Sequence, residues 1–449
     1  MKYKSILLIL ILAVLFACEP KTDDFSHSKG NADFTNYLAI GNSLTAGYTN
    51  GALYTSGQKY SYPNILAKQL KTVGMQGEFK QPLINTENGV GVSGSSLVTK
   101  FILNYSTDCL GTTSVGPVRA VKDPDTATLK TELYTSVASQ GPFNNIGIPS
   151  LKSTTILYPG YGELNPFYGR FAENPTTDAV IDEFSKIDYT FFTLWLGSND
   201  VLLYAVSGGA DDVITPMDGT PGIGFAASMD AVITSLTDNG KGAIANIPDI
   251  MSAPYFTFMQ TQIPYNGLVL VRQGQVDSLN AAYHPFGITF SLGQNPFIVQ
   301  DAISGYPRQM KKTDNLLLSL PTDSLKCFGF GSKIPIPHKY FLDETEMDKI
   351  NTAVTEYNET IKDLVSLHEN AVFVDMNSYL DEFKTGKDFD GIHFTSDFIS
   401  GNIFSLDGIH LTPQGNAIVA NYFIDKINTA FNSNIPKVSI SDYPNVPFP

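Results

Sequence analysis

Three segments far apart in the chain carry side chains that could perform nucleophilic catalysis. Ser43 offers a hydroxyl, Asn199 an amide, and Asp407 and His410 a carboxylate and an imidazole. A serine hydroxyl becomes a useful nucleophile only when a neighbouring base takes its proton. An imidazole that a carboxylate holds in place is such a base. The residue types therefore indicate acyl transfer through a serine, provided that folding brings them together.

The spacing of these residues suits that chemistry. Asp407 lies three residues before His410, so in a turn its carboxylate can reach one ring nitrogen while the other faces Ser43. Attack on an ester creates an oxyanion, and the loss of one donor to it typically lowers turnover by about 10²–10³-fold. We expect the Asn199 side chain and the backbone N–H of Ser43 to be donors.

The elements around these residues predict a parallel sheet. A β-like run at 36–40 leads into Ser43, and an almost unbroken apolar run at 188–196 ends just before Asn199. Strands that alternate with helices favour a parallel α/β sheet, and ligands bind such sheets beyond the carboxyl ends of the strands. We therefore expect one shared cleft. Further strands are predicted at 144–148, 242–247 and 371–376, and helices at 62–73, 224–238, 344–367 and 412–431.

Two stretches interrupt this alternation, and we predict them to be insertions into a domain at 36–430. Residues 74–140 are rich in Gly, Thr and Ser, and residues 255–340 are aromatic and Pro-rich. The second stretch could wall an acyl-binding pocket or pack over the sheet, and packing is favoured because apolar residues of an insertion usually bury one another. The tail at 431–449 is expected to lie over the surface.

The N-terminus has the features of an export signal. Its apolar run is too short to span a bilayer, and it ends in Leu-Phe-Ala-Cys18, which resembles a bacterial lipobox. We expect a signal peptide at 1–17, an acylated Cys18 and a polar tether at 18–35, with acyl chains as the membrane anchor. An ordinary secretory signal is the alternative. Acidic residues after Cys18 resemble the surface-export signal of Bacteroidetes lipoproteins, which places the protein at the outer membrane or cell surface.

The remaining cysteines and the net charge limit the possible partners. Cys109 and Cys327 could form a disulfide in an exported protein, or both could be buried free thiols. Their spacing fits no metal site, and no cofactor is expected. The formal charge of −15 would repel nucleic acid, so no nucleic-acid partner is expected.

The segments around the candidate residues resemble blocks of the SGNH (GDSL-like) hydrolases. More closely, the chain is similar to the GDSL-like lipase/acylhydrolase lipoproteins of Bacteroidetes. The resemblance implies a flavodoxin-like three-layer α/β/α fold with a mostly parallel sheet. It also implies metal-free ester hydrolysis through an acyl-enzyme by a Ser-His-Asp triad. The similar segments, in the family's order, are IGNSLTAGY at 40–48, GSND at 197–200, NIPD at 246–249 and DGIHLTPQG at 407–415.

The chain departs from the family's pattern at two places. Asn42 replaces the usual Asp before the serine, and we expect little loss because an amide can still bond backbone groups. The second block is best matched by 145–150, which puts Ser150 where Gly is usual. The Ser150 N–H would complete the oxyanion hole, although a positive φ there would strain a serine. Gly147 is the alternative donor.

The tetrapeptide Asp-Gly-Ile-His occurs twice, because Asp390 to His393 repeats it 17 residues earlier. The second copy precedes Thr412, Pro413 and a helical pattern, as a catalytic loop leading into the last helix should. We therefore assign the base to His410, and expect the first copy to be a loop that could line the cleft.

Together these features predict a serine ester hydrolase acting on an acylated lipid or an acetylated glycan. The alternative is a non-catalytic surface lipoprotein that binds glycan or lipid on the same scaffold. The presence of all four side-chain types (Ser, Asn, Asp and His) favours catalysis, since a site that has lost its activity has no chemical reason to keep them all.

Overall fold

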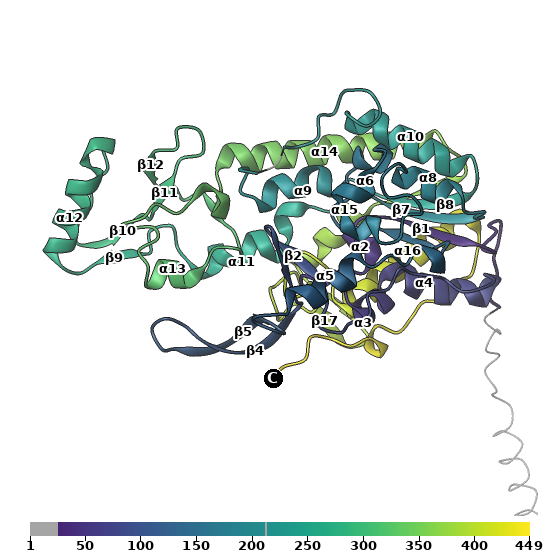
Figure 1. Cartoon of the computed structure of the whole chain (residues 1–449), viewed down its shortest axis with the longest axis horizontal. Coiled ribbons are helices and arrows are strands. Elements are labelled where there is room, and N and C mark those ends of the chain that lie inside the picture. The colour runs from purple at the N-terminus through teal and green to yellow at the C-terminus, as the bar shows by residue number, and fades with distance from the viewer. Residues whose placement is uncertain (1–25, 212) are drawn as a thin grey trace, which may run out of the picture.

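A five-stranded parallel sheet forms the middle layer of a three-layer α/β/α body (Figure 1). The computed structural model describes residues 26–211 and 213–449. The strand order is β6 (Asn145–Gly147), β1 (Tyr37–Gly41), β7 (Phe191–Trp195), β8 (Lys241–Ala245) and β15 (Ala371–Val374). Numbered along the chain this order is 2-1-3-4-5, the flavodoxin-like order. The expected α/β fold is confirmed.

The sequence explains why this sheet is central. Every residue of β1 and β7 is buried, as apolar runs without alternation predict for strands covered on both faces. In the 2-1-3-4-5 order, the connections from the first sheet strand diverge between β1 and β7, and ligands bind at that switch point. Ser43 and Asn199 follow these two strands.

Helices cover both faces of the sheet (Figure 1). The last helix begins where the sequence indicates, because Thr412 Oγ1 accepts the Gly415 N–H at 2.9 Å and Pro413 occupies its first position. On one face lie α4 (Tyr62–Leu70) and α16 (Pro413–Phe431), and on the other lie α8 (Val180–Ser185), α9 (Asn199–Val206), α10 (Phe225–Thr237) and α14 (Glu344–Ser366). Short helices complete the body: α2 (Ser43–Ala46), α3 (Thr55–Lys59), α6 (Tyr161–Leu164), α7 (Pro166–Gly169) and α15 (Met376–Asp381).

The two interrupting stretches build structure outside the sheet. The first forms a long hairpin, and the second forms a lobe whose buried hydrophobic clusters are separate from the main core. The aromatic stretch thus packs mainly against itself. The first contains β2 (Gly91–Ser93), β3 (Ser96–Val98), β4 (Phe101–Thr107), β5 (Thr113–Arg119) and α5 (Thr126–Tyr134). The lobe contains α11 (Pro254–Gln262), β9 (Leu268–Leu270), α12 (Gln273–Tyr283), β10 (Gly293–Asn295), β11 (Ile298–Gln300), β12 (Pro307–Gln309), β13 (Asn315–Leu316) and α13 (Thr322–Lys326), and closes at β14 (Phe341–Leu342).

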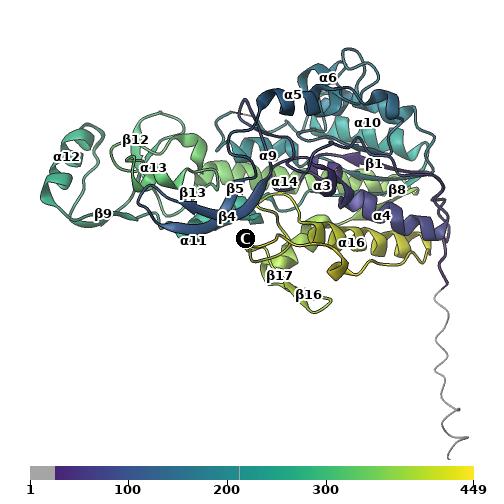
Figure 2. The same cartoon turned by 60° about the horizontal axis from the view of Figure 1, so that its bottom comes forward.

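A disulfide joins the tip of the hairpin to the lobe. Cys109, in the turn between β4 and β5, is bonded to Cys327, which follows α13. Beside it, Lys326 Nζ lies 2.8 Å from the Asp108 carboxylate. Figure 2 shows the hairpin running along the lobe. Of the two states left open for these cysteines, the structure has the disulfide.

The N-terminal end of the described chain lies against the residues that follow α16. The backbone of Ser28 bonds that of Asn434, and the C-terminal tail then follows α16, where the Asn421 side chain binds the backbone of Val438. The predicted signal peptide at 1–17 and the predicted acylation site at Cys18 lie outside the described residues. Among the helices of 26–211 and 213–449, none is long and apolar enough to cross a membrane.

Candidate active site

The nucleophile candidate stands at the carboxyl end of β1. Ser43 is the first residue of α2 and is 7% exposed. The Asn42 side chain accepts the Leu44 N–H at 3.0 Å. The amide thus caps this short helix, as the Asp that is usual at this position would. A Cβ on Gly41 would lie 2.2 Å from Thr45 Oγ1. Glycine there lets α2 turn back tightly over the strand and lift Ser43 toward the surface.

An imidazole and a carboxylate from the other end of the chain complete a relay with Ser43. His410 Nε2 lies 2.9 Å from Ser43 Oγ, and His410 Nδ1 lies 2.9 Å from Asp407 Oδ2. A carboxylate can only accept, so Nδ1 carries the proton and the Nε2 lone pair faces the serine hydroxyl. This is the tautomer that a general base for Ser43 requires.

The carboxylate is held on every side by donors. Asp407 Oδ1 accepts the N–H groups of Ile409 at 2.9 Å and His410 at 2.8 Å, and Oδ2 also accepts the Gly51 N–H at 2.7 Å. Burial alone would raise the pKa of Asp407, but the charge of His410 and these hydrogen bonds outweigh it. They hold the pKa of this carboxyl well below its usual range. Asp407 is therefore ionised across the working pH range.

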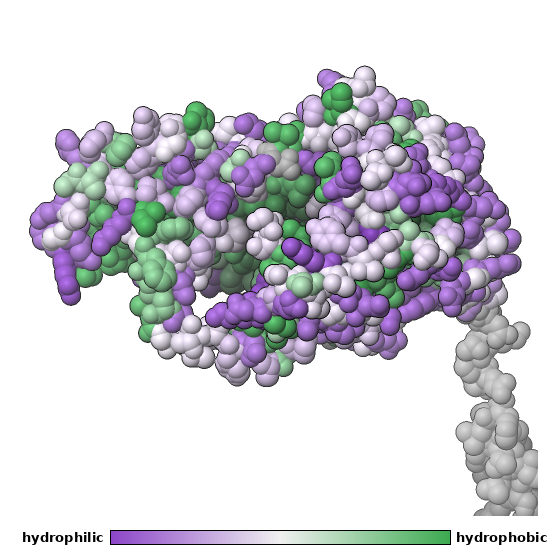
Figure 3. Space-filling model, viewed as in Figure 1, coloured by the Kyte–Doolittle hydropathy of each residue, from purple (hydrophilic) through white to green (hydrophobic). Residues whose placement is uncertain are grey.

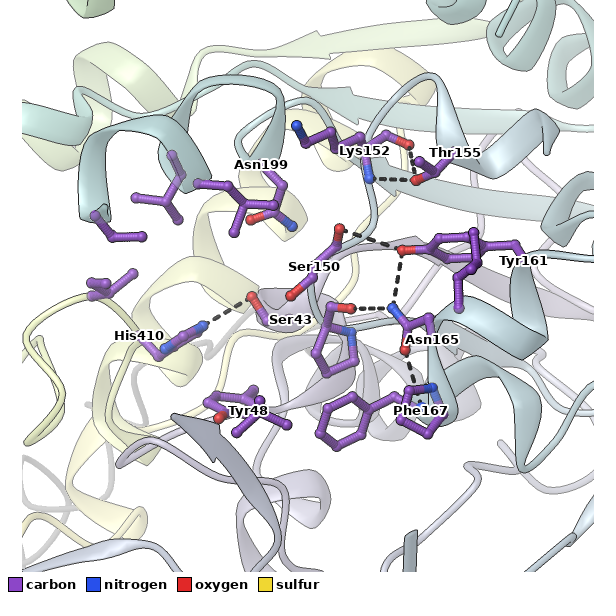
Figure 4. A pocket seen from close by; sticks show the side chains of 18 residues that line it. Ser43, Tyr48, Ser150, Lys152, Thr155, Tyr161, Asn165, Phe167, Asn199 and His410 are labelled. Carbon is purple, nitrogen blue, oxygen red and sulfur yellow. Dashed lines mark hydrogen bonds between the residues drawn. The ribbon is translucent and has the colours of Figure 1, made fainter. Parts of the chain in front are cut away.

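The turn after β6 brings Ser150 to the same edge of the sheet. Ser150 has φ +65°, which lies in the left-handed region. This is the strained conformation considered above for a serine at the position where the family usually has Gly. Ser150 lines the cavity in front of Ser43 (Figure 4). The Gly147 N–H, the alternative donor, is already bonded to Asn145 Oδ1 at 2.9 Å. Among the described residues no acceptor bonds the Ser150 N–H, so Ser150 is the better placed of the two.

Asn199 begins α9 at the end of β7 and also lines the cavity. One hydrogen of its amide goes to the Leu151 carbonyl at 3.0 Å, which ties the side chain to the turn that carries Ser150. The second amide hydrogen remains for a ligand. Figure 4 shows Asn199 and Ser150 on the side of Ser43 away from His410. The base and the candidate oxyanion donors thus flank the hydroxyl.

Asp200 fixes the Ser150 turn from below. Its carboxylate accepts the Ser153 N–H at 2.8 Å and the Ser153 hydroxyl at 2.7 Å. Burial raises the pKa of Asp200 to about 6, although the hydrogen bonds from Ser153 oppose the shift. These contacts make Asp200 a residue that fixes the loop.

The cavity in front of Ser43 has a volume of about 570 Å³, within the 300–1,000 Å³ range of small-molecule sites. Its wall is mainly apolar, with Leu202, Leu203 and Val206 from α9 and Phe167 from α7, and Lys152 adds a cationic group. In the space-filling view a hollow with hydrophobic residues on its floor separates the lobe from the body (Figure 3). None of the residues in the cavity wall comes from 255–340.

The first Asp-Gly-Ile-His copy forms a different structure. Asp390 and Gly391 both have positive φ and make the two-residue turn between β16 (Lys387–Phe389) and β17 (Ile392–Phe394). His393 therefore pairs across the hairpin with Asp388 at 2.7 Å and is not in the cavity wall. The expected loop is a surface hairpin. In the second copy, Asp407 instead folds back onto the N–H groups that follow it.

Two contributors to the site were not singled out in the sequence. The Tyr48 ring packs 4.8 Å from the His410 ring, and Gly51 donates to Asp407. Tyr48 lies inside the first block, so its position was a usable signal. A backbone N–H has no signature of its own, and only the fold could reveal the Gly51 contact. In 26–211 and 213–449 no cluster of three or more His, Cys, Asp or Glu side chains could hold a metal ion.

Comparison with known proteins agrees with the resemblance seen in the blocks. The family model described as GDSL-like Lipase/Acylhydrolase matches residues 37–423. No curated protein and no solved structure gives a match. The matched span begins at β1 and ends within α16, so it includes every candidate site residue and both insertions.

Proposed function

Because the chain belongs to the GDSL-like lipase/acylhydrolase family, an ester-hydrolysing family, we propose that Ser43, His410 and Asp407 are its catalytic triad. The observation that carries this proposal is the continuous relay from Ser43 Oγ through both ring nitrogens to Asp407 Oδ2, with each step 2.9 Å long. Such a relay activates a hydroxyl whose own acidity is too weak for attack at neutral pH.

In the first half-reaction, Ser43 Oγ attacks the ester carbonyl carbon and its proton passes to His410 Nε2. The carbonyl oxygen becomes an oxyanion, and the N–H groups of Ser43 and Ser150 with Asn199 Nδ2 donate to it. The carbon–oxygen bond to the alcohol then breaks, and His410 returns its proton to the leaving oxygen. Asp407 stays ionised throughout and stabilises the imidazolium.

In the second half-reaction, a water molecule takes the place of the alcohol. His410 accepts a proton from the water as its oxygen attacks the acyl carbon, and the same donors hold the second oxyanion. The bond to Ser43 Oγ breaks, the serine regains its proton from His410, and the carboxylic acid leaves. The ester and the water are the only reactants that these two steps need in addition to the side chains of the protein.

A fluorophosphonate probe tests the nucleophile, because it bonds covalently to an activated serine. Wild-type protein lacking residues 1–18 should label at Ser43, and the Ser43→Ala variant should not. His410→Ala should lower ester hydrolysis by about 10⁴-fold or more. The matched control is His393→Ala, the same substitution in the same tetrapeptide, which should leave hydrolysis unchanged. Labelling that persists in Ser43→Ala would end the assignment.

We also propose that the enzyme is an exported lipoprotein held at the membrane by an acylated Cys18. Its support is the lipobox-like segment that ends in Cys18, since two or more acyl chains give stable anchoring. Cells that express the full chain and are fed an alkyne fatty acid should label it in the membrane fraction. A Cys18→Ser variant that labels equally would contradict acylation at this residue.

A further inference from the structure

A second, smaller cavity lies next to the catalytic cavity, on the other side of two shared wall residues. Leu202 and Ile409 line both cavities and form the boundary between them. Ile409 directly precedes His410, and Leu44, which also lines the narrow cavity, directly follows Ser43. This side pocket is therefore adjacent to the residues that carry the reacting atoms.

The side pocket is an apolar environment. Its wall includes Trp195, Ile250, Ala253, Phe404 and Leu411, each less than 9% exposed. Two of its polar side chains are already engaged, because Lys384 binds the Asp249 carboxylate at 2.8 Å and the Ser252 hydroxyl binds the Asp249 carbonyl at 2.7 Å. The Ser198 hydroxyl is buried and has no hydrogen-bond partner among the described residues. A hydrocarbon that enters this pocket therefore leaves no further polar group unpaired.

We propose that this side pocket holds the outer carbons of the acyl chain of the ester, and that the wider cavity receives the alcohol. The acyl group stays bonded to Ser43 Oγ through the intermediate, so its chain needs a site next to the serine. The alcohol must leave, and the wider cavity has polar groups in its wall at Lys152, Thr155 and Asn165. The inference rests on the proposed function and narrows it to esters with an alkyl acyl group longer than acetyl.

The size of the side pocket limits the chain. Its volume of about 50 Å³ is far below the 300–1,000 Å³ of sites that hold a whole small molecule, so it takes only the end of a chain. With p-nitrophenyl esters the alcohol is constant and only the acyl group varies. We expect kcat/KM to rise about fourfold for each methylene that enters the side pocket, and to level off once the pocket is filled.

Two substitutions in the pocket wall test the assignment in opposite directions. Ala253→Leu narrows the pocket and should lower the octanoyl-to-acetyl ratio of kcat/KM at least tenfold. Ile250→Ala widens it and should move the preferred acyl group to a longer chain. The matched control is Ala281→Leu, the same change at an exposed position on α12, which should leave the ratio unchanged. A folded Ala253→Leu protein with the wild-type ratio, or an acetyl preference in the wild type, would overturn the inference.

Failure of this inference can be told apart from failure of the proposed function. If Ser43 labels with fluorophosphonate and short esters are hydrolysed, the triad assignment stands whatever the chain-length profile. A flat profile would then reject the side pocket alone. If neither labelling nor hydrolysis of any ester depends on Ser43, the proposed function fails, and the acyl assignment with it.

Discussion

At the residue scale, the state of one carboxylate decides how the imidazole works. Asp407 fixes the proton on His410 Nδ1, so Asp407→Asn should present the wrong tautomer while it preserves the shape of the loop. We expect kcat to fall on the order of 10⁴-fold with a smaller change in KM. Steady-state kinetics on a short ester would measure this. A fall of less than tenfold would mean that His410 is oriented without the carboxylate.

The same carboxylate should influence stability at low pH. Its folded-state pKa lies below the unfolded value, so Asp407 stabilises the fold above about pH 4. That contribution is lost as the pH falls, because the unfolded chain then binds the proton first. The difference in free energy of unfolding between wild type and Asp407→Asn should therefore shrink from pH 6 to pH 3. Urea titrations at both pH values would measure this difference. A difference that grows as the pH falls would contradict a lowered pKa for Asp407.

Asp200 should behave in the opposite way. Its pKa is raised to about 6 in the folded protein, so the fold loses stability as the pH rises from about 4 through 6. Because a tenfold change in proton affinity corresponds to about 1.4 kcal/mol, the loss is at most about 3 kcal/mol. Asp200→Asn cannot ionise and should lack this loss. Unfolding free energies at pH 4.5 and 7 in both proteins would show it, and equal pH dependence would contradict the assignment.

At the element scale, close approach of backbone explains why the site needs small residues. A Cβ on Gly147 would lie 2.2 Å from the Ala46 N atom of α2, so β6 and the nucleophile helix touch there. Gly147→Ala should destabilise the protein by about 2 kcal/mol or more and displace Ser43, which lowers kcat. Thermal unfolding and kinetics together would record both effects.

The control for that prediction is Gly274→Ala on α12. A Cβ on Gly274 would have no atom within 4 Å, and the residue lies inside a helix, where alanine is favoured over glycine by about 1 kcal/mol. The substitution should therefore stabilise the lobe slightly and leave kcat unchanged. Equal effects of the two substitutions would show that the contact of β6 with α2 carries no strain.

The elements that the sequence could predict are those that local pattern defines. Apolar runs predicted β1 and β7, and helical periodicity with Thr412 and Pro413 predicted α16. The β4–β5 hairpin was not predicted from the sequence, because its strands are largely exposed and lack the alternation that marks a half-buried sheet. The block match favoured Ser150 but could not exclude Gly147, because the engagement of the Gly147 N–H by Asn145 depends on side-chain geometry within one turn.

At the scale of the whole molecule, the two insertions and the catalytic loop are linked in a ring of contacts, with hydrogen bonds near the catalytic loop and a disulfide between the insertions. The hairpin begins beside Gly51, where the Phe101 N–H donates to the Asn50 carbonyl at 2.7 Å, and Gly51 donates to Asp407. The lobe begins at Tyr255, whose N–H donates to the Gly408 carbonyl at 3.0 Å. The lobe thus touches the Asp407–His410 loop directly, the hairpin reaches it through Asn50 and Gly51, and the disulfide joins the hairpin tip to the lobe. The pairing of the cysteines could not be read from the sequence, because it depends on two insertions meeting in space.

This ring of contacts predicts that the disulfide contributes to both stability and turnover. A bond between cysteines 218 positions apart restricts the unfolded chain strongly, and removal of such a bond typically costs 2–5 kcal/mol, with about 5 kcal/mol as the chain-entropy limit. The double variant Cys109→Ser, Cys327→Ser should lose about that much free energy of unfolding, and wild type in reductant should match it. Because the lobe contacts the catalytic loop directly and the hairpin contacts it through Asn50 and Gly51, kcat should fall severalfold as well. An unchanged kcat would mean that the hydrogen bonds of Asp407 alone fix the loop, and that the disulfide acts on stability only.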